Sequence, residues 1–269
     1  MRKNLKPLSI LFMFLFFYIF YENVYAEEPI LITLSSNLDK VIFDGKWTDP
    51  WEWKQSSYNK LYFEDDGAMI HLRTAHQDNS IYIQINFESD KTINKGFDSA
   101  MVCFDTKNDK TIIPQDDDYC FSTILDTKKS FSYQGNNSTE INNSFIRIPN
   151  DKNFIAIGTA SDKFDRYSKV PHSSYEFKIP LDVLGRSDNY GFYINIFDGD
   201  SENHYTWPYE IKSQNSNLFS SPNQWGDLVS PDKSLPEFHY SILFFVLVLM
   251  IFFVTTTRFN LFKIHIFRY

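Results

Sequence analysis

Segments in which apolar and polar residues alternate fill the middle of this chain. Residues 81–88 (IYIQINFE) carry an isoleucine or phenylalanine at every other position, and this period of two is typical of a β-strand with one buried face. The same alternation occurs in residues 68–74, 174–179 and 192–197. Other apolar runs predict further strands: residues 30–34, 40–43, 60–63, 100–105, 118–125, 144–148 and 154–158.

Turn-forming residues separate these predicted strands. Residues 66–67 (DG), 94–96 (NKG) and 135–137 (GNN) combine the residue types that favour tight turns. Short, closely spaced strands rich in Phe, Tyr and Ile predict an all-β fold, an antiparallel β-sandwich of the jelly-roll kind. Residues 180–185 (PLDVLG) are an exception, because Pro at the start and Gly at the end predict a short helical turn.

Two apolar stretches without alternation lie at the ends of the chain. Residues 8–20 follow three basic residues and precede Ala26, with Val24 and Ala26 at the small-residue positions, so we expect a secretory signal peptide over residues 1–26. Residues 238–257 contain no acid, lysine or arginine and have the length of a transmembrane helix, about 20 residues. The alternative for the first stretch is an uncleaved anchor, and the alternative for the second is a buried core helix.

These features divide the chain into a signal peptide (1–26), an ectodomain (27–229), a stalk (230–237), a transmembrane helix (238–257) and a cytoplasmic tail (258–269). The tail is basic and has no acid, as cytoplasmic flanks are. We therefore expect a single-pass protein of the cell membrane with its ectodomain outside. The net charge is −8, and because both ends are basic, the acids gather in the ectodomain. Such a surface repels phosphate backbones, which excludes nucleic acid as a partner, and suits cations and neutral ligands.

The two cysteines of the chain, Cys103 and Cys120, lie in two neighbouring predicted strands of the ectodomain. If these strands form a hairpin with the cysteines opposite each other, a disulfide is expected in an oxidising compartment. Two reduced, buried thiols are the alternative. Asn136, Asn137 and Asn142 each begin an Asn-x-Ser/Thr sequence within a polar stretch, which predicts a glycoprotein with glycans on that loop.

The order of these segments resembles the carbohydrate-binding modules of family 9 and the wider group of DOMON-like sandwich domains. The resemblance spans about residues 30–229. The motifs that carry it are residues 42–45 (IFDG) with Trp47 and Trp51 close behind, 76–83 (HQDNSIYI), 98–105 followed by 117–119 (DDY), 175–181 (YEFKIPL), Trp207-Pro208 and 225–228 (WGDL).

The resemblance implies a domain that binds sugars in some branches and haem in others. Sugar rings stack on flat aromatic faces, and the ectodomain holds all five tryptophans. We expect Trp207 to serve as a stacking platform, with Trp51 or Trp53 facing it across a cleft, while Trp225 belongs to the core. Packing of Trp207 in the core is the alternative. The expected role is non-catalytic recognition of carbohydrate at the cell surface.

Acidic side chains form clusters that suit calcium, which prefers oxygen ligands from loops, and similar domains often hold a structural calcium. We predict Asp105, Asp117 and Asp118 as the ligands. A solvated acidic loop is the alternative, because none of the runs has EF-hand spacing. The remaining acids of these runs are Asp109, Asp116, Asp198, Asp200 and Glu202.

Two other function classes stay open. Non-covalent haem would need axial ligands such as Met with His, for which the candidates are Met69, Met101, His71 and His76; covalent haem is excluded because no C-x-x-C-H occurs. An envelope protein that uses the sandwich only for protein contacts is the other alternative. No G-x-S-x-G or H-E-x-x-H occurs, so the chain is not expected to be an enzyme, and any hydrolytic role would be that of an accessory module to a separate enzyme.

Overall fold

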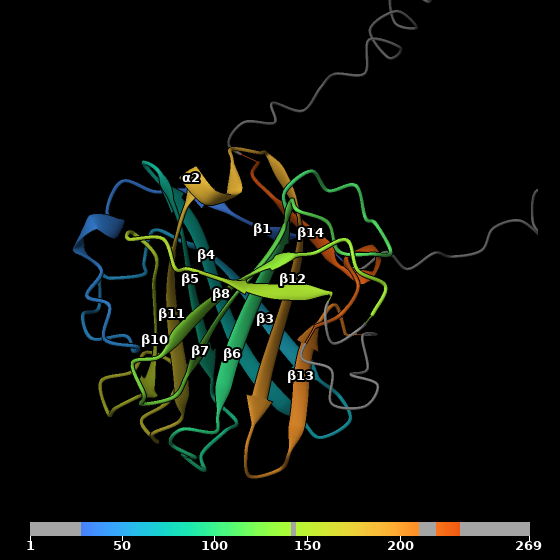
Figure 1. The fold of residues 1–269 in the computed structure, drawn as a ribbon. Coiled ribbons are helices and arrows are strands. Elements are labelled where there is room, and N and C mark those ends of the chain that lie inside the picture. Colours follow the sequence, from blue (N-terminus) through green and yellow to red (C-terminus); the bar gives the residue numbers. More distant parts are fainter. Residues whose placement is uncertain (1–27, 141–143, 210–218, 232–269) are drawn as a thin grey trace, which may run out of the picture.

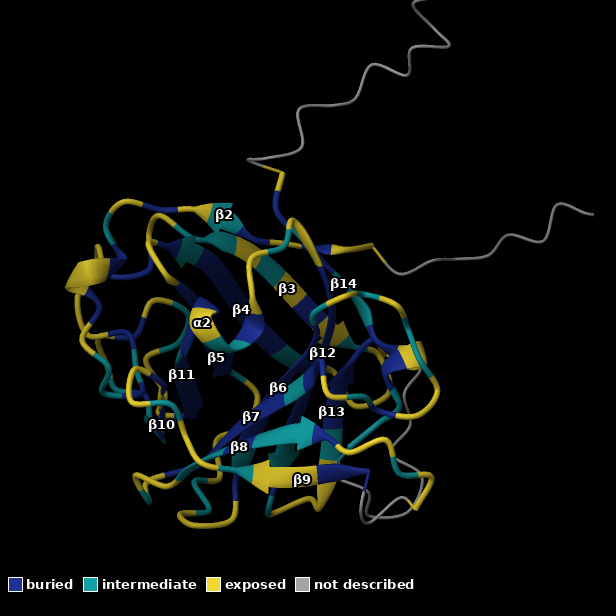
Figure 2. Cartoon of the chain, turned by 45° about the horizontal axis from the view of Figure 1, so that its top comes forward, coloured by how far each residue is buried: buried dark blue, intermediate teal, exposed yellow. Residues whose placement is uncertain are grey.

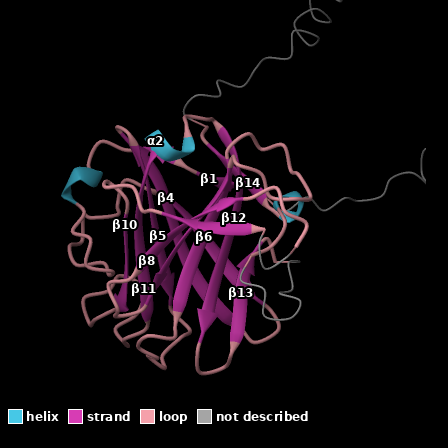
Figure 3. Cartoon of the chain, viewed as in Figure 1, coloured by secondary structure: helices cyan, strands magenta, loops and turns pink. Residues whose placement is uncertain are grey.

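The computed structural model describes residues 28–140, 144–209 and 219–231. Within these residues the chain folds into two β-sheets that pack face to face (Figure 1). Strands make up both layers and loops connect their ends, with little helix (Figure 3). The predicted all-β sandwich is confirmed.

The larger sheet contains eight strands among the described residues. Its order is β1 (Ile30–Leu31), β14 (Gly226–Val229), β12 (Asn189–Asp198), β6 (Ser99–Asp105), β7 (Asp118–Ile124), β8 (Ser130–Gly135) and β9 (Phe145–Ile148), with β13 (Asn203–Trp207) paired to β12.

The smaller sheet has six strands in the same part of the chain. Its order is β10 (Ile155–Ala160), β11 (Ser173–Pro180), β5 (Ser80–Phe87), β4 (Ala68–Gln77) and β2 (Thr33–Leu34), with β3 (Ser57–Phe63) paired to β4. In the described part of the chain, three short helical segments lie between strands: η1 (Leu38–Lys40), α2 (Leu181–Leu184) and η3 (Pro222–Gln224). The predicted helical turn at 180–185 corresponds to α2, which ends at Gly185 with a positive φ of 74°.

The strands at the N-terminus are parallel to their neighbours, so the predicted purely antiparallel arrangement is wrong. The segment predicted as one strand, residues 30–34, splits into β1, which pairs in parallel with β14 of the large sheet, and β2, which pairs in parallel with β4 of the small sheet. The N–H of Ile32, between them, still donates to the carbonyl of Val229 at 2.9 Å. The chain thus passes from one layer to the other at Ile32 and ties the sheets together.

The structure also differs from the prediction in one expected strand that does not form and in strands that were not expected. The strand predicted at 40–43 is wrong: the N–H of Ile42 donates to the Glu52 carboxylate at 2.7 Å instead of to a neighbouring strand. Strands β8 and β13 were not predicted, because polar residues interrupt their short sequences.

The core lies between the sheets and follows the alternation in the sequence. Ile81, Ile83, Ile85 and Phe87 of β5 are all buried against the inner face of the large sheet. Burying each such side chain contributes about 1.5–3 kcal/mol relative to leaving it exposed. Figure 2 shows this dark interior between exposed loops.

The small sheet is also covered on its outer face, which the alternation alone does not predict. The polar residues that alternate with the core positions of β5, including Gln84 and Asn86, are fully buried. Residues 36–56 and 162–172 pass over them: the loop residue Trp53 bonds to Glu176 of β11, and Asp165 bonds to Asn86. The outer face of the large sheet remains the more open one.

A disulfide joins Cys103 of β6 to Cys120 of β7, as predicted. The two residues lie directly opposite each other in the strand register, with their Cα atoms 4.1 Å apart. Both side chains point to the outer face of the large sheet, because their strand neighbours Val102 and Phe121 point into the core.

Among the described residues, no helix is long and apolar enough to cross a membrane. The predicted signal peptide (1–26), transmembrane helix (238–257) and cytoplasmic tail (258–269) lie outside the described residues, as does Asn142. Asn136 and Asn137 lie on the exposed turn after β8. Their side chains are accessible to solvent, and their glycosylation stays a prediction.

Candidate functional site

Trp207 lies in the core, which contradicts its predicted role as a sugar-stacking platform. It pairs in register with Ile194 of β12, an inward-facing residue, and its side chain is only 2% exposed. Its ring packs against Phe192 with centroids 6.0 Å apart. A Cβ atom at Gly226 would come within 2.2 Å of the indole, so this glycine leaves room for the buried ring. The alternation of β13 turns Thr206, not Trp207, to the outer face.

The other two predicted platform residues lie on the far side of the small sheet. Trp53 is 0% exposed, and its Nε1 donates to Oε1 of Glu176 at 2.9 Å, so Trp53 is also not a platform. Trp51 is 61% exposed, with the Lys54 ammonium 3.9 Å from its ring centroid. The small sheet separates the loop of Trp51 from Trp207, so the two do not face each other across a cleft. Of the three predicted platform residues, Trp51 is the one that is exposed.

Trp225 is buried, as predicted, but on the outer face of the large sheet rather than between the layers. It stacks on Tyr193 at 6.1 Å and on Phe145 at 6.2 Å. This second apolar cluster also contains the disulfide and Met101. It covers one half of the outer face and leaves the other half open.

The open half of this face forms a groove across four strands. Its floor is a row of residues that are neighbours in register: Asn195 of β12, Met101 of β6, Ser122 of β7 and Phe131 of β8. The short side chain of Ser122 makes the depression in the middle of the row. The groove has a volume of about 130 Å³, below the ~300–1,000 Å³ of typical small-molecule sites, so it is a shallow depression.

Aromatic side chains border the groove on both sides. Residues two positions along a strand lie about 7 Å away on the same face, so Phe197 and Ile124 form one wall and Tyr133 the other. Phe197, Phe131 and Tyr133 are half-buried and thus present part of each ring to solvent. An arginine, Arg147 of β9, lies 4.4 Å from the centroid of Phe131.

Polar groups lie within and beside the floor. The amide oxygen of Asn195 is 2.9 Å from Nδ1 of His204, which stacks obliquely on Phe197. Burial lowers the pKa of His204, so its ring is neutral at physiological pH. The Ser99 and Ser122 hydroxyls add groups that both donate and accept. The groove therefore combines flat apolar walls with uncharged hydrogen-bonding groups, the chemistry that sugar recognition requires. No sequence signal marked it, because its residues come from four separate strands.

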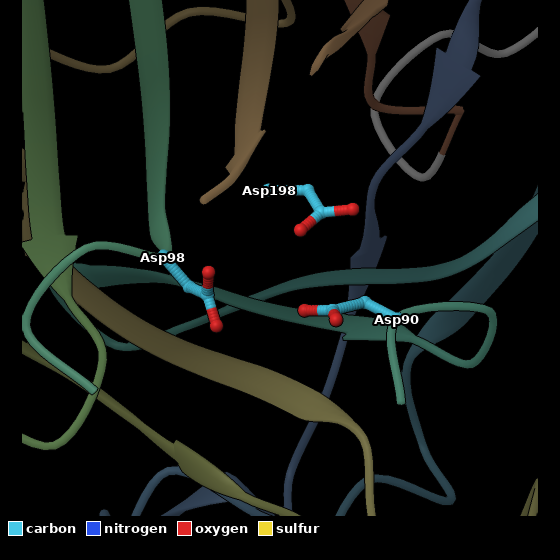
Figure 4. Close-up of side chains that lie close together, drawn as sticks. All are labelled: Asp90, Asp98 and Asp198. Atoms are coloured by element: carbon cyan, nitrogen blue, oxygen red, sulfur yellow. The ribbon is translucent and has the colours of Figure 1, made fainter. Parts of the chain in front are cut away.

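Three carboxylates converge at one end of the sandwich, close to this groove (Figure 4). Asp90 follows β5, Asp98 precedes β6 and Asp198 ends β12, and one oxygen from each lies within 4.8 Å of the others. All three are buried. Burial, with the charges of Asp98 and Asp198, raises the pKa of Asp90 to about 6.

This cluster fits a calcium ion. Oδ2 of Asp90, on a side chain only 3% exposed, has no hydrogen-bond partner, and none of the three carboxylates forms an ion pair in the described part of the chain. Buried charges are normally paired or bound to a metal, and calcium prefers carboxylate and carbonyl oxygens. Asp90, Asp98 and Asp198 would hold the ion, which would neutralise them and fix the loops that carry them. Sequence reasoning did not select this set, since Asp90 and Asp198 are far apart along the chain.

Two of the calcium ligands predicted from the sequence belong to a second cluster of three carboxylates. Asp105 and Asp117 do come together, but the third member is Asp109 rather than Asp118. Oδ2 of Asp118 accepts a hydrogen bond from the N–H of Gln115 at 2.7 Å, and burial raises the pKa of Asp118 to about 8. Lys107 already lies 3.3 Å from the Asp117 carboxylate. A lysine thus supplies part of the positive charge here.

Of the candidate haem ligands, His71 and His76 have hydrogen-bond partners in the described part of the chain, and Met101 lies on the other sheet. Nδ1 of His71 is 2.8 Å from the Tyr58 hydroxyl and Nε2 is 2.8 Å from the Glu88 carboxylate, so both ring nitrogens have partners. Met101 lies on the outer face of the opposite sheet from His71. Met69 is on the same strand as His71, and His76 lies 3.3 Å from the Ser230 hydroxyl.

Comparisons with known proteins identify similar solved structures but no family. The chain matches no protein-family model and no curated protein. Among solved structures it is similar to a family 9 carbohydrate-binding module from Caldicellulosiruptor kristjanssonii in complex with glucose, at 16% identity and a TM-score of 0.47, covering 76% of this chain and 95% of that one. The same module in complex with cellotriose matches at 16% identity and a TM-score of 0.45, covering 78% and 98%.

Proposed function

We propose that this protein binds carbohydrate, without catalysis, in the groove on the outer face of the large sheet. One observation carries the proposal: aromatic walls at Phe197 and Tyr133 border a floor with uncharged polar groups at Asn195 and Ser122. Apolar C–H faces of a sugar would pack on the walls while its hydroxyls exchange hydrogen bonds with the floor. The order of segments along the sequence, which resembles carbohydrate-binding modules, supports the same function.

A binding assay with groove variants tests this proposal. The full-length chain in detergent is applied to a glycan array that includes glucose and cellotriose, and the best glycan is then measured by calorimetry. We expect Asn195→Ala and Tyr133→Ala each to weaken binding about tenfold or more, because each removes a hydrogen bond or a packing surface worth about 1.4 kcal/mol.

Trp51→Ala is the matched control, since it removes an exposed aromatic ring from the other side of the molecule. We expect it to leave binding unchanged. If Trp51→Ala abolished binding while the groove variants retained it, the sugar site would lie on the loop of Trp51. Absence of any glycan bound by the intact chain would reject carbohydrate recognition altogether.

We further propose that residues 1–26 direct export and that residues 238–257 anchor the chain, so that the groove faces the outside of the cell. The apolar length and basic flank of 238–257 support this proposal. Amino-terminal sequencing of the mature protein and alkaline extraction of membranes test it. A chain that begins at Met1 or leaves the membrane in carbonate would contradict it.

A further inference from the structure

An exposed arginine lies at one end of the groove. Arg147 of β9 pairs in register with Tyr133 of β8, and residues directly opposite each other in paired strands share one face of the sheet. Because Tyr133 lines the groove, the side chain of Arg147 also lies on the outer face. Its guanidinium carbon is 4.4 Å from the ring centroid of Phe131, the residue at the β8 end of the groove floor. In the described part of the chain β9 is the last strand of the large sheet (Figure 2), so the arginine marks the end of the groove.

The N–H groups of this guanidinium are available to a ligand. Arg147 is exposed, and in the described part of the chain its guanidinium forms no hydrogen bond and no ion pair. The Phe131 ring attracts the cation through its face and thereby limits the conformations of a long side chain. A guanidinium that is already held in place loses less conformational entropy when it binds a ligand.

The groove beside the arginine is uncharged. The described residues that line it are apolar or neutral polar: Ser99, Ala100, Met101, Ser122, Ile124, Phe131, Tyr133, Asn195 and Phe197. The chain as a whole is acidic, with a net charge of −8, and such a surface repels anionic ligands. A positive charge at the end of an uncharged groove therefore favours a ligand that is mostly neutral and carries a negative charge at one point.

We propose that the groove selects acidic sugars and that Arg147 binds the carboxylate of a uronic acid. The inference rests on the proposed function. The sugar ring would pack on the aromatic walls and exchange hydrogen bonds with Ser122 and Asn195. Its carboxylate would accept two parallel hydrogen bonds from the planar guanidinium, a geometry that an ammonium group does not provide.

The strand spacing places the arginine within reach of such a sugar. Ser122 of β7 and Phe131 of β8 are neighbours in register, and neighbouring strands lie about 4.8 Å apart. The guanidinium lies over Phe131, one strand away from the depression at Ser122. A pyranose ring in that depression therefore needs only a carboxylate at C6 to contact the arginine.

Sugars that differ only at C6 test the inference on the full-length chain in detergent. The methyl glycosides of glucose and glucuronic acid, of galactose and galacturonic acid, and of mannose and mannuronic acid form three such pairs, and calorimetry measures the affinity of each member. In the pair that binds best, we expect the carboxylate member to bind about fivefold or more tightly than its neutral partner, an effect that a well-aligned exposed ion pair can supply.

Substitutions of the arginine assign the preference to its side chain. Arg147→Gln removes the charge at an exposed position, so we expect it to fold and to bind both members of the pair with similar affinity. Arg147→Lys keeps the charge without the planar fork and should retain only part of the preference. Arg166→Gln is the matched control: it removes another exposed arginine whose guanidinium lies over an aromatic ring, 5.4 Å from the centroid of Trp47, on the loop of residues 162–172. We expect Arg166→Gln to keep the preference.

Salt separates a direct ion pair from a difference in shape. Exposed ion pairs weaken as ionic strength rises, so we expect added sodium chloride to weaken binding of the carboxylate sugar by the wild type. For Arg147→Gln only repulsion from the acidic chain remains, and salt should not weaken that binding.

The outcomes also distinguish the inference from the proposed function. Equal affinity of the wild type for both members of each pair would overturn the inference and leave carbohydrate binding standing. A preference for the carboxylate that Arg147→Gln retains, or that Arg166→Gln loses, would overturn it as well. If neither neutral nor acidic sugars bound to the intact chain, the proposed function would fail, and the selection of acidic sugars would fail with it.

Discussion

Glu176 of β11 accepts a hydrogen bond from Nε1 of Trp53 at 2.9 Å, although 123 residues separate the two in sequence. Its other oxygen accepts from the backbone N–H groups of Asp44 and Gly45 at 3.1 and 2.9 Å. One fully buried carboxylate thus fastens the loop of residues 36–56 onto the outer face of the small sheet. This closure explains why that face is covered and why the groove lies on the other sheet.

Removing this carboxylate should destabilise the fold. We expect Glu176→Ala to lower the free energy of unfolding by about 3 kcal/mol or more, because each buried donor left without an acceptor costs about 1–3 kcal/mol. Urea unfolding measures the change. Glu176→Gln, which keeps the shape and one acceptor, should lose less. Equal losses for the two variants would show that the hydrogen bonds of Glu176 contribute little.

The same residue should make stability depend on pH. Burial raises the pKa of Glu176 well above its ordinary value, so the folded state holds a proton that the unfolded state releases above about pH 4.5. Stability is then lost as pH rises from about 4.5 through the pKa of the folded state. We expect the urea midpoint to fall between pH 5 and pH 8 more steeply for the wild type than for Glu176→Gln. Parallel pH profiles would contradict this.

Gly226 and Trp207 should behave as a coupled pair. A methyl group at Gly226 would lie 2.2 Å from the buried indole, so we expect Gly226→Ala to cost about 1–3 kcal/mol through overpacking. Adding Trp207→Phe, which shortens the ring, should recover part of the loss, and a double-mutant cycle measures the coupling. Strict additivity would mean that the ring and the glycine do not constrain each other.

The disulfide should stabilise the large sheet. It closes a loop with a sequence separation of 17 residues, for which the chain-entropy relation gives about 3 kcal/mol. We expect the Cys103→Ser, Cys120→Ser double variant to lose stability of that order in chemical unfolding. Dithiothreitol should shift the midpoint of the wild type but not that of the variant. A wild type insensitive to the reductant would indicate two reduced thiols.

The carboxylate cluster leads to an unusual expectation for the metal-free protein. In EGTA, Asp90→Asn should raise the melting temperature, because it removes one of three buried like charges and breaks no hydrogen bond of Oδ2. Asp116→Asn, at an exposed site, should stay within about 0.5 kcal/mol of the wild type. A lower melting temperature for Asp90→Asn in EGTA would show that the cluster is not under electrostatic strain.

Local patterns along the chain were enough to predict most strands. The alternation in β5 placed Ile81, Ile83 and Ile85 correctly in the core, and the positions of Cys103 and Cys120 in neighbouring strands predicted their pairing. Every second residue of a strand faces the core and must be apolar, so the period of two can be read directly from the sequence. The strand predicted at 40–43 failed because the Glu52 carboxylate, rather than another strand, pairs with its backbone.

The candidate site could be predicted only in part. Tryptophan is common in sugar sites, yet Trp207 faces Ile194 and belongs to the core, while the groove uses Phe197 and Tyr133. Asp105 and Asp117 were correctly expected to lie together. Asp118 does not join them, and its Oδ2 accepts a hydrogen bond from a backbone N–H instead. Residue type alone does not reveal which face of a sheet a side chain occupies when the strand has not been recognised, as with β13.

The sequence by itself determined that the chain forms a layered β structure with a cystine bridge, because hydrophobic alternation and turn chemistry are local properties. Tertiary structure alone decided which face became open and which carboxylates met. Pairing between strands distant in sequence brings Asp90, Asp98 and Asp198 to one end of the sandwich and Asn195, Met101 and Ser122 into one row. These arrangements depend on strand register and loop closure, which are set by contacts summed over the whole fold.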